Sequence, residues 1–109
     1  QYEKANEYLE RAVLLSSDPM LYYVMAKNEQ CLGEYRQAEK HLLHAIDILP
    51  ERIYPYYLLM NLYTEPSYFQ PAKLKMAIDS VLTKKPKVES SAIKEMKEKA
   101  RSMLNNTSI

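Results

Sequence analysis

The chain has 109 residues and a net charge of +1, and it contains one glycine, one cysteine, ten tyrosines and no tryptophan. Phosphate-binding loops, dinucleotide fingerprints and nucleophile elbows each need at least two glycines, so all three are excluded. The balanced charge argues against a nucleic-acid partner, and Cys31 cannot form an intrachain disulfide.

The spacing of apolar residues is helical almost throughout, and glycine and β-branched residues are scarce, so the sequence predicts an all-α fold. Helices are predicted over residues 2–15, 20–32, 35–49, 54–64, 71–83 and 89–104. The breaks between the helices are predicted at Ser17 or Asp18 with Pro19, at Gly33, at Pro50, over the loop 65–70 and at Pro86. Ser90 or Glu89 is expected to cap the last helix, and residues 105–109 are expected to fray.

These helices repeat in pairs. The pattern Tyr-x-x-Ala-x-x-x-Leu-x-x-Ala begins at Tyr2 and again at Tyr35, 33 residues later. A Tyr-Tyr pair followed by two apolar residues begins at Tyr22 and again at Tyr56, 34 residues later. A third copy of the second-type helix, 36 residues later, aligns Leu74, Ile78, Val81 and Leu82 with Ala38, Leu42, Ala45 and Ile46. A period of this length indicates stacked helix–turn–helix units.

Residues 19–52 resemble the tetratricopeptide repeat. The resemblance is carried by Tyr22, Met25 and Ala26 in the first helix, by Gly33 and Tyr35 at the turn, and by Ala38, Leu42, Ala45 and Pro50 after it. Glu29 stands where the family usually has an aromatic residue, so wetter packing is expected there. The resemblance implies a short right-handed superhelix of about six helices. Its parts are the second helix of a truncated repeat (1–18), a complete repeat (19–52), a repeat with a longer loop (53–87) and a capping helix with a tail (88–109).

The last helix is expected to turn its apolar side to the final repeat and its charged side to water. The apolar side comprises Val88, Ala92, Ile93, Met96, Ala100, Met103 and Leu104, and the charged side comprises Lys94, Lys97, Glu98, Lys99 and Arg101. Most tyrosines, including Tyr2, Tyr22, Tyr35, Tyr56 and Tyr63, are expected to pack in the core.

In the tetratricopeptide frame the concave groove commonly holds a peptide or a helix, and rigid aromatic side chains are good anchors for either. The groove residues implied by the frame are Met20, Tyr23, Lys27 and Gln30 from one repeat, and Tyr54, Tyr57, Asn61 and Thr64 from the next. Another helix of the parent protein could fill the groove instead. The Lys–Asn clamp for a peptide carboxylate is not expected, because Tyr23 and Leu58 occupy its positions.

No reactive group stands out, so no enzyme activity, catalytic residue, cofactor or metal is predicted. His41 and His44 lie one helical turn apart, but a structural zinc site needs four ligands. They are interpreted as surface or inter-repeat residues. Cys31 is interpreted as a partly buried small hydrophobe, because no orienting group or oxyanion donor accompanies it. The rival hypothesis is a glycan-acting enzyme with its active site upstream.

Residues 71–109 carry 9 basic and 4 acidic side chains, with Lys84, Lys85 and Lys87 close together. One interpretation is contact with an anionic membrane surface or glycan. The favoured interpretation is a solvated linker and cap, because Glu89, Glu95 and Glu98 dilute the positive field. No run is long enough to span a bilayer.

The turn Arg52-Ile53-Tyr54-Pro55, with the segment 87–96, is similar to the C-terminal tetratricopeptide extension of O-antigen ligase or polymerase-like membrane proteins of Bacteroidetes. This resemblance implies a soluble bacterial interaction module attached to an inner-membrane parent that assembles surface polysaccharide, with the compartment left open. The chain opens inside an amphipathic pattern, as a piece of something longer would. The face of its truncated first helix is expected to permit dimers.

Overall fold

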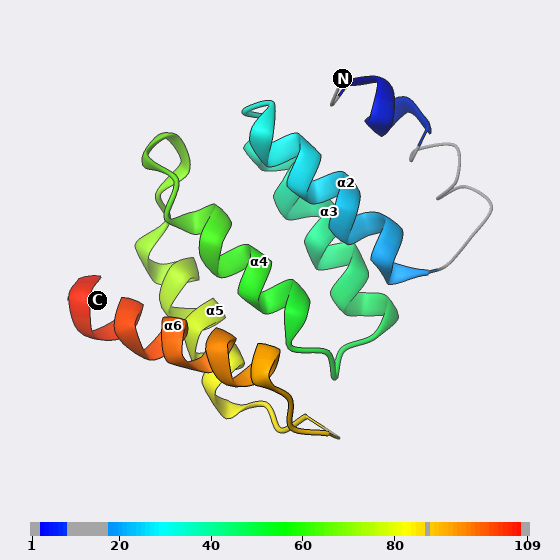
Figure 1. Cartoon of the computed structure of the whole chain (residues 1–109). Helices are drawn as coiled ribbons and strands as arrows, with labels where there is room; N and C mark the ends of the chain where they lie inside the picture. Colours follow the sequence, from blue (N-terminus) through cyan, green and yellow to red (C-terminus); the bar gives the residue numbers. More distant parts are fainter. Residues whose placement is uncertain (1–2, 9–17, 87, 108–109) are drawn as a thin grey trace. The chain divides into compact units, whose positions relative to one another are not determined.

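The computed structural model describes residues 3–8, 18–86 and 88–107, and the regular elements among these residues are helices, with no strand (Figure 1). Residues 3–8 form a short helical segment. The elements that follow are α2 (Pro19–Cys31), α3 (Tyr35–Ile48), α4 (Tyr54–Tyr63), the 3-10 turn η1 (Pro66–Tyr68), α5 (Pro71–Thr83) and α6 (Ser91–Thr107). The predicted all-α class is confirmed. Two compact units divide the chain, unit 1 over residues 1–50 and unit 2 over residues 51–109.

Unit 1 is built around the hairpin of α2 and α3, which lie side by side (Figure 1). The Asp18 carboxylate accepts a hydrogen bond from the Met20 amide at 3.0 Å, so Asp18 caps the start of α2. Gly33 closes the hairpin with φ of +80°, a left-handed conformation that L side chains rarely adopt. The predicted role of this glycine as the turn between two helices is confirmed.

The α2–α3 interface is made by small residues flanked by large ones. Ala26, Ala38 and Ala45 are almost fully buried, so the two helix backbones can approach closely there. Met25 and Leu42 fill the space beside them and are equally buried. The small and large positions of the repeat pattern are therefore core positions in this unit.

Unit 2 packs α4 against α5 and α5 against α6 (Figure 1). Pro55 lies in the first turn of α4, where a missing amide costs nothing, and it is fully buried. The core comprises Leu58, Leu59, Met60 and Leu62 of α4, Leu74, Ala77, Ile78 and Val81 of α5, and Ala100 of α6. Of the positions that the third copy of the repeat pattern aligns with α3, Leu74, Ile78 and Val81 are buried and Leu82 is half-buried.

The structure corrects several details of α6. The helix continues through residues 105–107, which were expected to fray, and the side-chain amide of Asn106 donates to Ser102 Oγ at 3.3 Å. Ser90 Oγ accepts from the Ile93 amide at 3.3 Å, which confirms Ser90 as the cap. Val88 and Ala92 are exposed, although they were assigned to the apolar side. Both residues lie N-terminal to the part of α6 that contains the buried Ala100.

The expected burial of the tyrosines is only partly right. Tyr63 is buried, whereas Tyr22, Tyr35 and Tyr56 are half-buried. A tyrosine at a helix interface can bury its ring and keep its hydroxyl near water, which explains the intermediate values. Tyr2 lies outside the described residues.

Candidate functional site

The groove residues predicted in unit 1 follow one stripe of α2. Met20, Tyr23, Lys27 and Gln30 occur at the spacing i, i+3, i+7 and i+10, which places them along one side of the helix. Met20 and Lys27 are exposed and Gln30 is half-buried. Tyr23 is 4% exposed, so most of this tyrosine is part of the core. Met20 and Lys27 therefore offer most of the accessible surface of this stripe.

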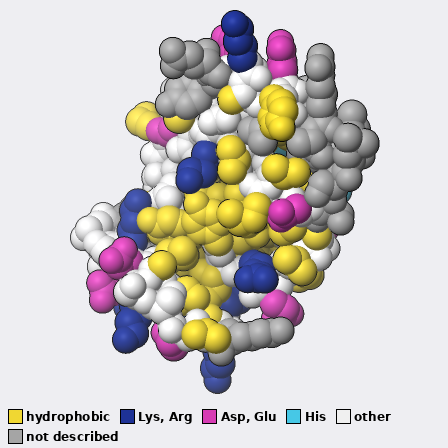
Figure 2. All heavy atoms as spheres, turned by 45° about the vertical axis from the view of Figure 1, so that its right-hand side comes forward, with side chains coloured by type: hydrophobic (Ala, Val, Ile, Leu, Met, Phe, Trp, Pro, Cys, Tyr) yellow, Lys and Arg dark blue, Asp and Glu magenta, His cyan; other side chains and the backbone are white. Residues whose placement is uncertain are grey.

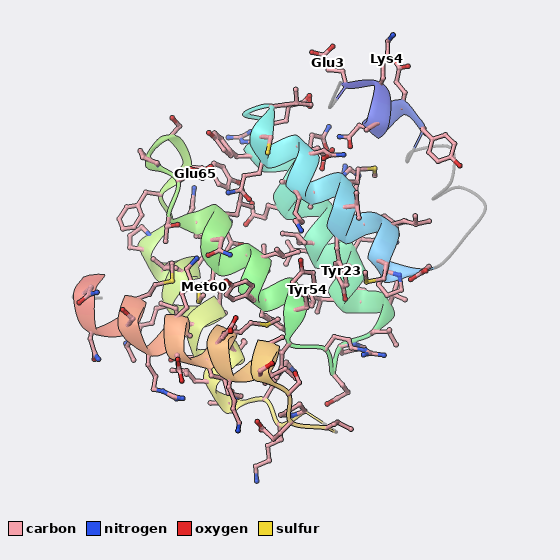
Figure 3. The ribbon with its side chains drawn as sticks, viewed as in Figure 1. Glu3, Lys4, Tyr23, Tyr54, Met60 and Glu65 are labelled. Carbon is pink, nitrogen blue, oxygen red and sulfur yellow. The ribbon has the colours of Figure 1, made fainter. Side chains whose placement is uncertain are left out.

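The groove residues predicted in unit 2 repeat the same spacing on α4. Tyr54, Tyr57, Asn61 and Thr64 are all half-buried, and the Thr64 hydroxyl donates to the Asn61 carbonyl at 2.7 Å, at the end of the helix. Tyr54 lies in the first turn of α4, and Met60 lies farther along the same helix (Figure 3). The N-terminal end of this stripe is therefore aromatic, and its C-terminal end is polar.

The aromatic end of this stripe is organised by ring contacts. The rings of Tyr54 and Tyr57 are stacked, with centroids 6.4 Å apart and planes inclined by 24°. Lys99 of α6 places its ammonium 5.5 Å from the centroid of the Tyr57 ring, within the range of a cation–π interaction. We call Tyr54, Tyr57 and Lys99 the tyrosine–lysine surface. Sequence reasoning missed Lys99, because its pairing with α4 depends on how α6 packs.

A second lysine lies at the same end of α4. The Lys84 ammonium stands 5.1 Å from the centroid of the Tyr56 ring. Tyr56 and Tyr57 are consecutive residues of the helix, so Lys84 and Lys99 approach α4 at neighbouring positions about 100° apart around its axis. The helix α4 carries no charged side chain of its own, so charge reaches its first turns from other elements, including these two cations.

A contact between Glu29 and His41 in unit 1 marks the position where the sequence departs from the tetratricopeptide pattern. Glu29 is 3% exposed, and its carboxylate lies 2.7 Å from His41 Nδ1 across the α2–α3 interface. Nearby, the Asn28 side-chain amide donates to Asn6 Oδ1 at 3.2 Å. The expected wetter packing at Glu29 takes the form of this polar contact. His41 is the partner of Glu29 because the turn at Gly33 places the end of α2 opposite the start of α3.

The same pair borders a cavity of about 290 Å³. Its lining is predominantly acidic and polar and consists of Glu3, Asn6, Glu7, Glu29, Leu32, Glu34, Gln37 and His41. Glu3 belongs to the helical segment 3–8 (Figure 3). Within the described part of the chain, no group of three or more His, Cys, Asp or Glu residues is arranged to hold a metal ion.

The remaining candidate residues, His44 and Cys31, are both exposed. His44 is exposed, and its ring centroid lies 4.7 Å from that of Tyr22. Cys31 is exposed rather than partly buried, because it ends α2 on a side away from the buried residues Met25, Ala26 and Glu29. The interpretation of Cys31 as a partly buried hydrophobe is therefore wrong.

One lysine of the basic C-terminal segment, Lys97, is not a surface charge. Lys97 donates to the backbone carbonyls of Val81 at 2.8 Å, Leu82 at 3.3 Å and Lys84 at 2.8 Å. It is half-buried, so its assignment to the water-facing side of α6 is wrong. Lysine, arginine and acidic side chains are interspersed on the face shown in Figure 2, and Lys87 lies outside the described residues.

The sequence matches no protein-family model and no curated protein. Among the residues that the structure describes, every helix is too short or too polar to be a candidate membrane span.

Proposed function

We propose that this chain is a non-enzymatic interaction module of the tetratricopeptide type, which binds a peptide or helix of another protein through the stripe of α2 in unit 1 or through the stripe of α4 in unit 2. The observation that carries the proposal is the repeated helix pair, in which Ala26, Ala38 and Ala45 are buried at the positions that the repeat pattern reserves for small residues. Paired helices of this kind present side chains at regular intervals, which suits recognition more than chemistry.

The polar and aromatic character of the stripes supports recognition of a peptide. Exposed Met20 and Lys27 on α2 and half-buried Tyr54, Tyr57 and Asn61 on α4 offer an adaptable thioether, rigid rings and hydrogen-bonding groups. A helix of the parent protein as occupant and an anionic membrane or glycan as ligand are the alternatives.

The proposal is tested with a displayed library of random peptides selected on the full chain. Peptides that are enriched are expected to bind in solution and to lose affinity with Met20→Ala or with Tyr57→Ala. Met76→Ala is the matched control, because Met76 is 70% exposed on α5 and belongs to neither stripe. Failure to enrich any peptide, or equal binding by all three variants, would contradict the proposal.

The cellular context is a finer proposal. The turn that carries the resemblance to O-antigen ligase-like proteins places Ile53 and Pro55 in the core, while Arg52 remains exposed. We place the module in such a surface-polysaccharide assembly protein. The test is the gene sequence upstream of Gln1, where several apolar runs of about 20 residues are expected, whereas a further repeat of this length would favour a longer helical array.

A further inference from the structure

We infer that the tyrosine–lysine surface of unit 2 binds a short acidic segment of a partner protein that carries an aromatic residue beside its carboxylates. This inference rests on the proposed interaction function and adds the chemistry of the partner. Its basis is the arrangement of Tyr54, Tyr57 and Lys99, which combines stacked aromatic area with an exposed cation.

The cation is already in position to pair with a carboxylate. Lys99 is exposed, and its ammonium is held 5.5 Å from the Tyr57 ring centroid. This ring interaction leaves the ammonium's N–H donors able to bind an oxygen, because a π face attracts the cation without accepting a strong hydrogen bond. Lys97, two residues earlier and about 200° around α6, differs because three backbone carbonyls accept hydrogen bonds from it.

The rings supply the second half of the chemistry. Tyr54 and Tyr57 form a stacked pair that is half-buried, so their orientation is restricted before any partner arrives. A further aromatic ring can extend this stack in an offset or edge-to-face arrangement. A phenyl or phenol ring next to a carboxylate would therefore contact the tyrosines while the carboxylate pairs with Lys99.

The charge of unit 2 favours an anionic partner. Residues 51–109 contain 10 Lys and Arg against 6 Asp and Glu, a net charge of +4. The first turns of α4 are free of acidic side chains, and Lys84 adds a second cation at Tyr56. Glu95, four residues before Lys99, is the acidic side chain placed to compete with a partner carboxylate. The net positive charge of unit 2 and the local pairing with Lys99 therefore both favour binding of an acidic segment.

The experiment measures binding of a fluorescent peptide to the full chain by anisotropy. The probe is an octapeptide that alternates Asp or Glu with Phe and is acetylated and amidated, so that its only carboxylates are on side chains. The comparison peptide replaces each Asp and Glu with Asn and Gln. The acidic peptide is expected to bind at least three-fold tighter, and the difference is expected to shrink with added salt.

The variants locate the site. Lys99→Gln is expected to weaken the acidic peptide about three- to five-fold and to remove its advantage over the amide peptide. Lys94→Gln is the matched control, because Lys94 is exposed on α6 about 140° around the helix from Lys99. Tyr57→Leu is expected to weaken both peptides, whereas Tyr57→Phe, which keeps the ring, is expected to bind normally. Glu95→Gln is expected to strengthen acidic binding.

Four results would overturn the inference. Equal affinity for the two peptides would remove the acidic requirement while leaving the interaction function intact. Binding of the acidic peptide that survives both Lys99→Gln and Tyr57→Leu would place the binding site elsewhere on the chain. Binding only to vesicles of phosphatidylcholine and phosphatidylserine would identify a membrane surface instead. Sedimentation that shows self-association lost in Lys99→Gln would identify a second copy of this chain as the occupant.

Discussion

At the scale of single residues, the contact between Glu29 and His41 is expected to have a clear effect on stability. A carboxylate that is 3% exposed loses most of its hydration, and the His41 ring nitrogen at 2.7 Å replaces part of it. A pair of this kind often adds little net stability compared with two apolar residues. Removing one partner alone is much worse, because the other is left buried without compensation.

A double-mutant cycle tests this asymmetry. His41→Leu is expected to destabilise the chain by about 2–3 kcal/mol, less than the loss of one partner of a fully buried pair, because the His41 side chain is 22% exposed. Adding Glu29→Met is expected to restore most of the loss, since the site then becomes apolar. Urea unfolding at neutral pH measures His41→Leu, Glu29→Met and the double variant. If the two single effects simply add, the pair is not coupled and the explanation is wrong.

At the scale of secondary-structure elements, Lys97 shows how one helix can complete another. The last carbonyls of α5 have no partner within their own helix, and no basic residue lies in the last turn of α5. The Lys97 ammonium of α6 donates to the carbonyls of Val81 and Leu82 in α5 and to the carbonyl of Lys84, the residue after the helix. Its positive charge also matches the negative end of the α5 dipole.

Replacing Lys97 measures this contribution. Lys97→Met keeps most of the aliphatic stem but removes the donor, and it is expected to lower stability by about 1–2 kcal/mol. Lys94→Met, at an exposed position of the same helix, is expected to change stability by less than about 0.5 kcal/mol. Thermal unfolding followed by circular dichroism compares the two. Equal melting temperatures for the two variants would show that the cap contributes nothing.

At the scale of the whole molecule, the features that could be predicted from the sequence are those that depend on residues close together in the chain. The α5 bounds, the turn at Gly33 and the buried alanines follow from prolines, glycine and the 3.6-residue period, which act within a few residues. Lys97 and Lys99 both read as surface residues of an amphipathic helix. Their roles depend on the neighbours that α6 packs against, and no periodicity along α6 encodes those neighbours.

The contact of α6 with α5 leads to a prediction about unit 2 as a folding unit. Its three helices share buried residues from all three elements, including Leu62 of α4, Ile78 of α5 and Ala100 of α6. A chain of residues 51–109 is near the size at which single domains still fold alone. This chain is therefore expected to be helical and to unfold cooperatively on heating, with lower stability than the full chain.

The matched control is a chain of residues 51–90, which lacks α6. It exposes the side of α5 that α6 covers and leaves the carbonyls that Lys97 binds without their donor. Because helices gain most of their stability from packing, this shorter chain is expected to lose both its helical signal and its cooperative transition. If residues 51–90 unfolded as cooperatively as residues 51–109, α6 would be dispensable for unit 2, and the three-helix core would not be the basis of its stability.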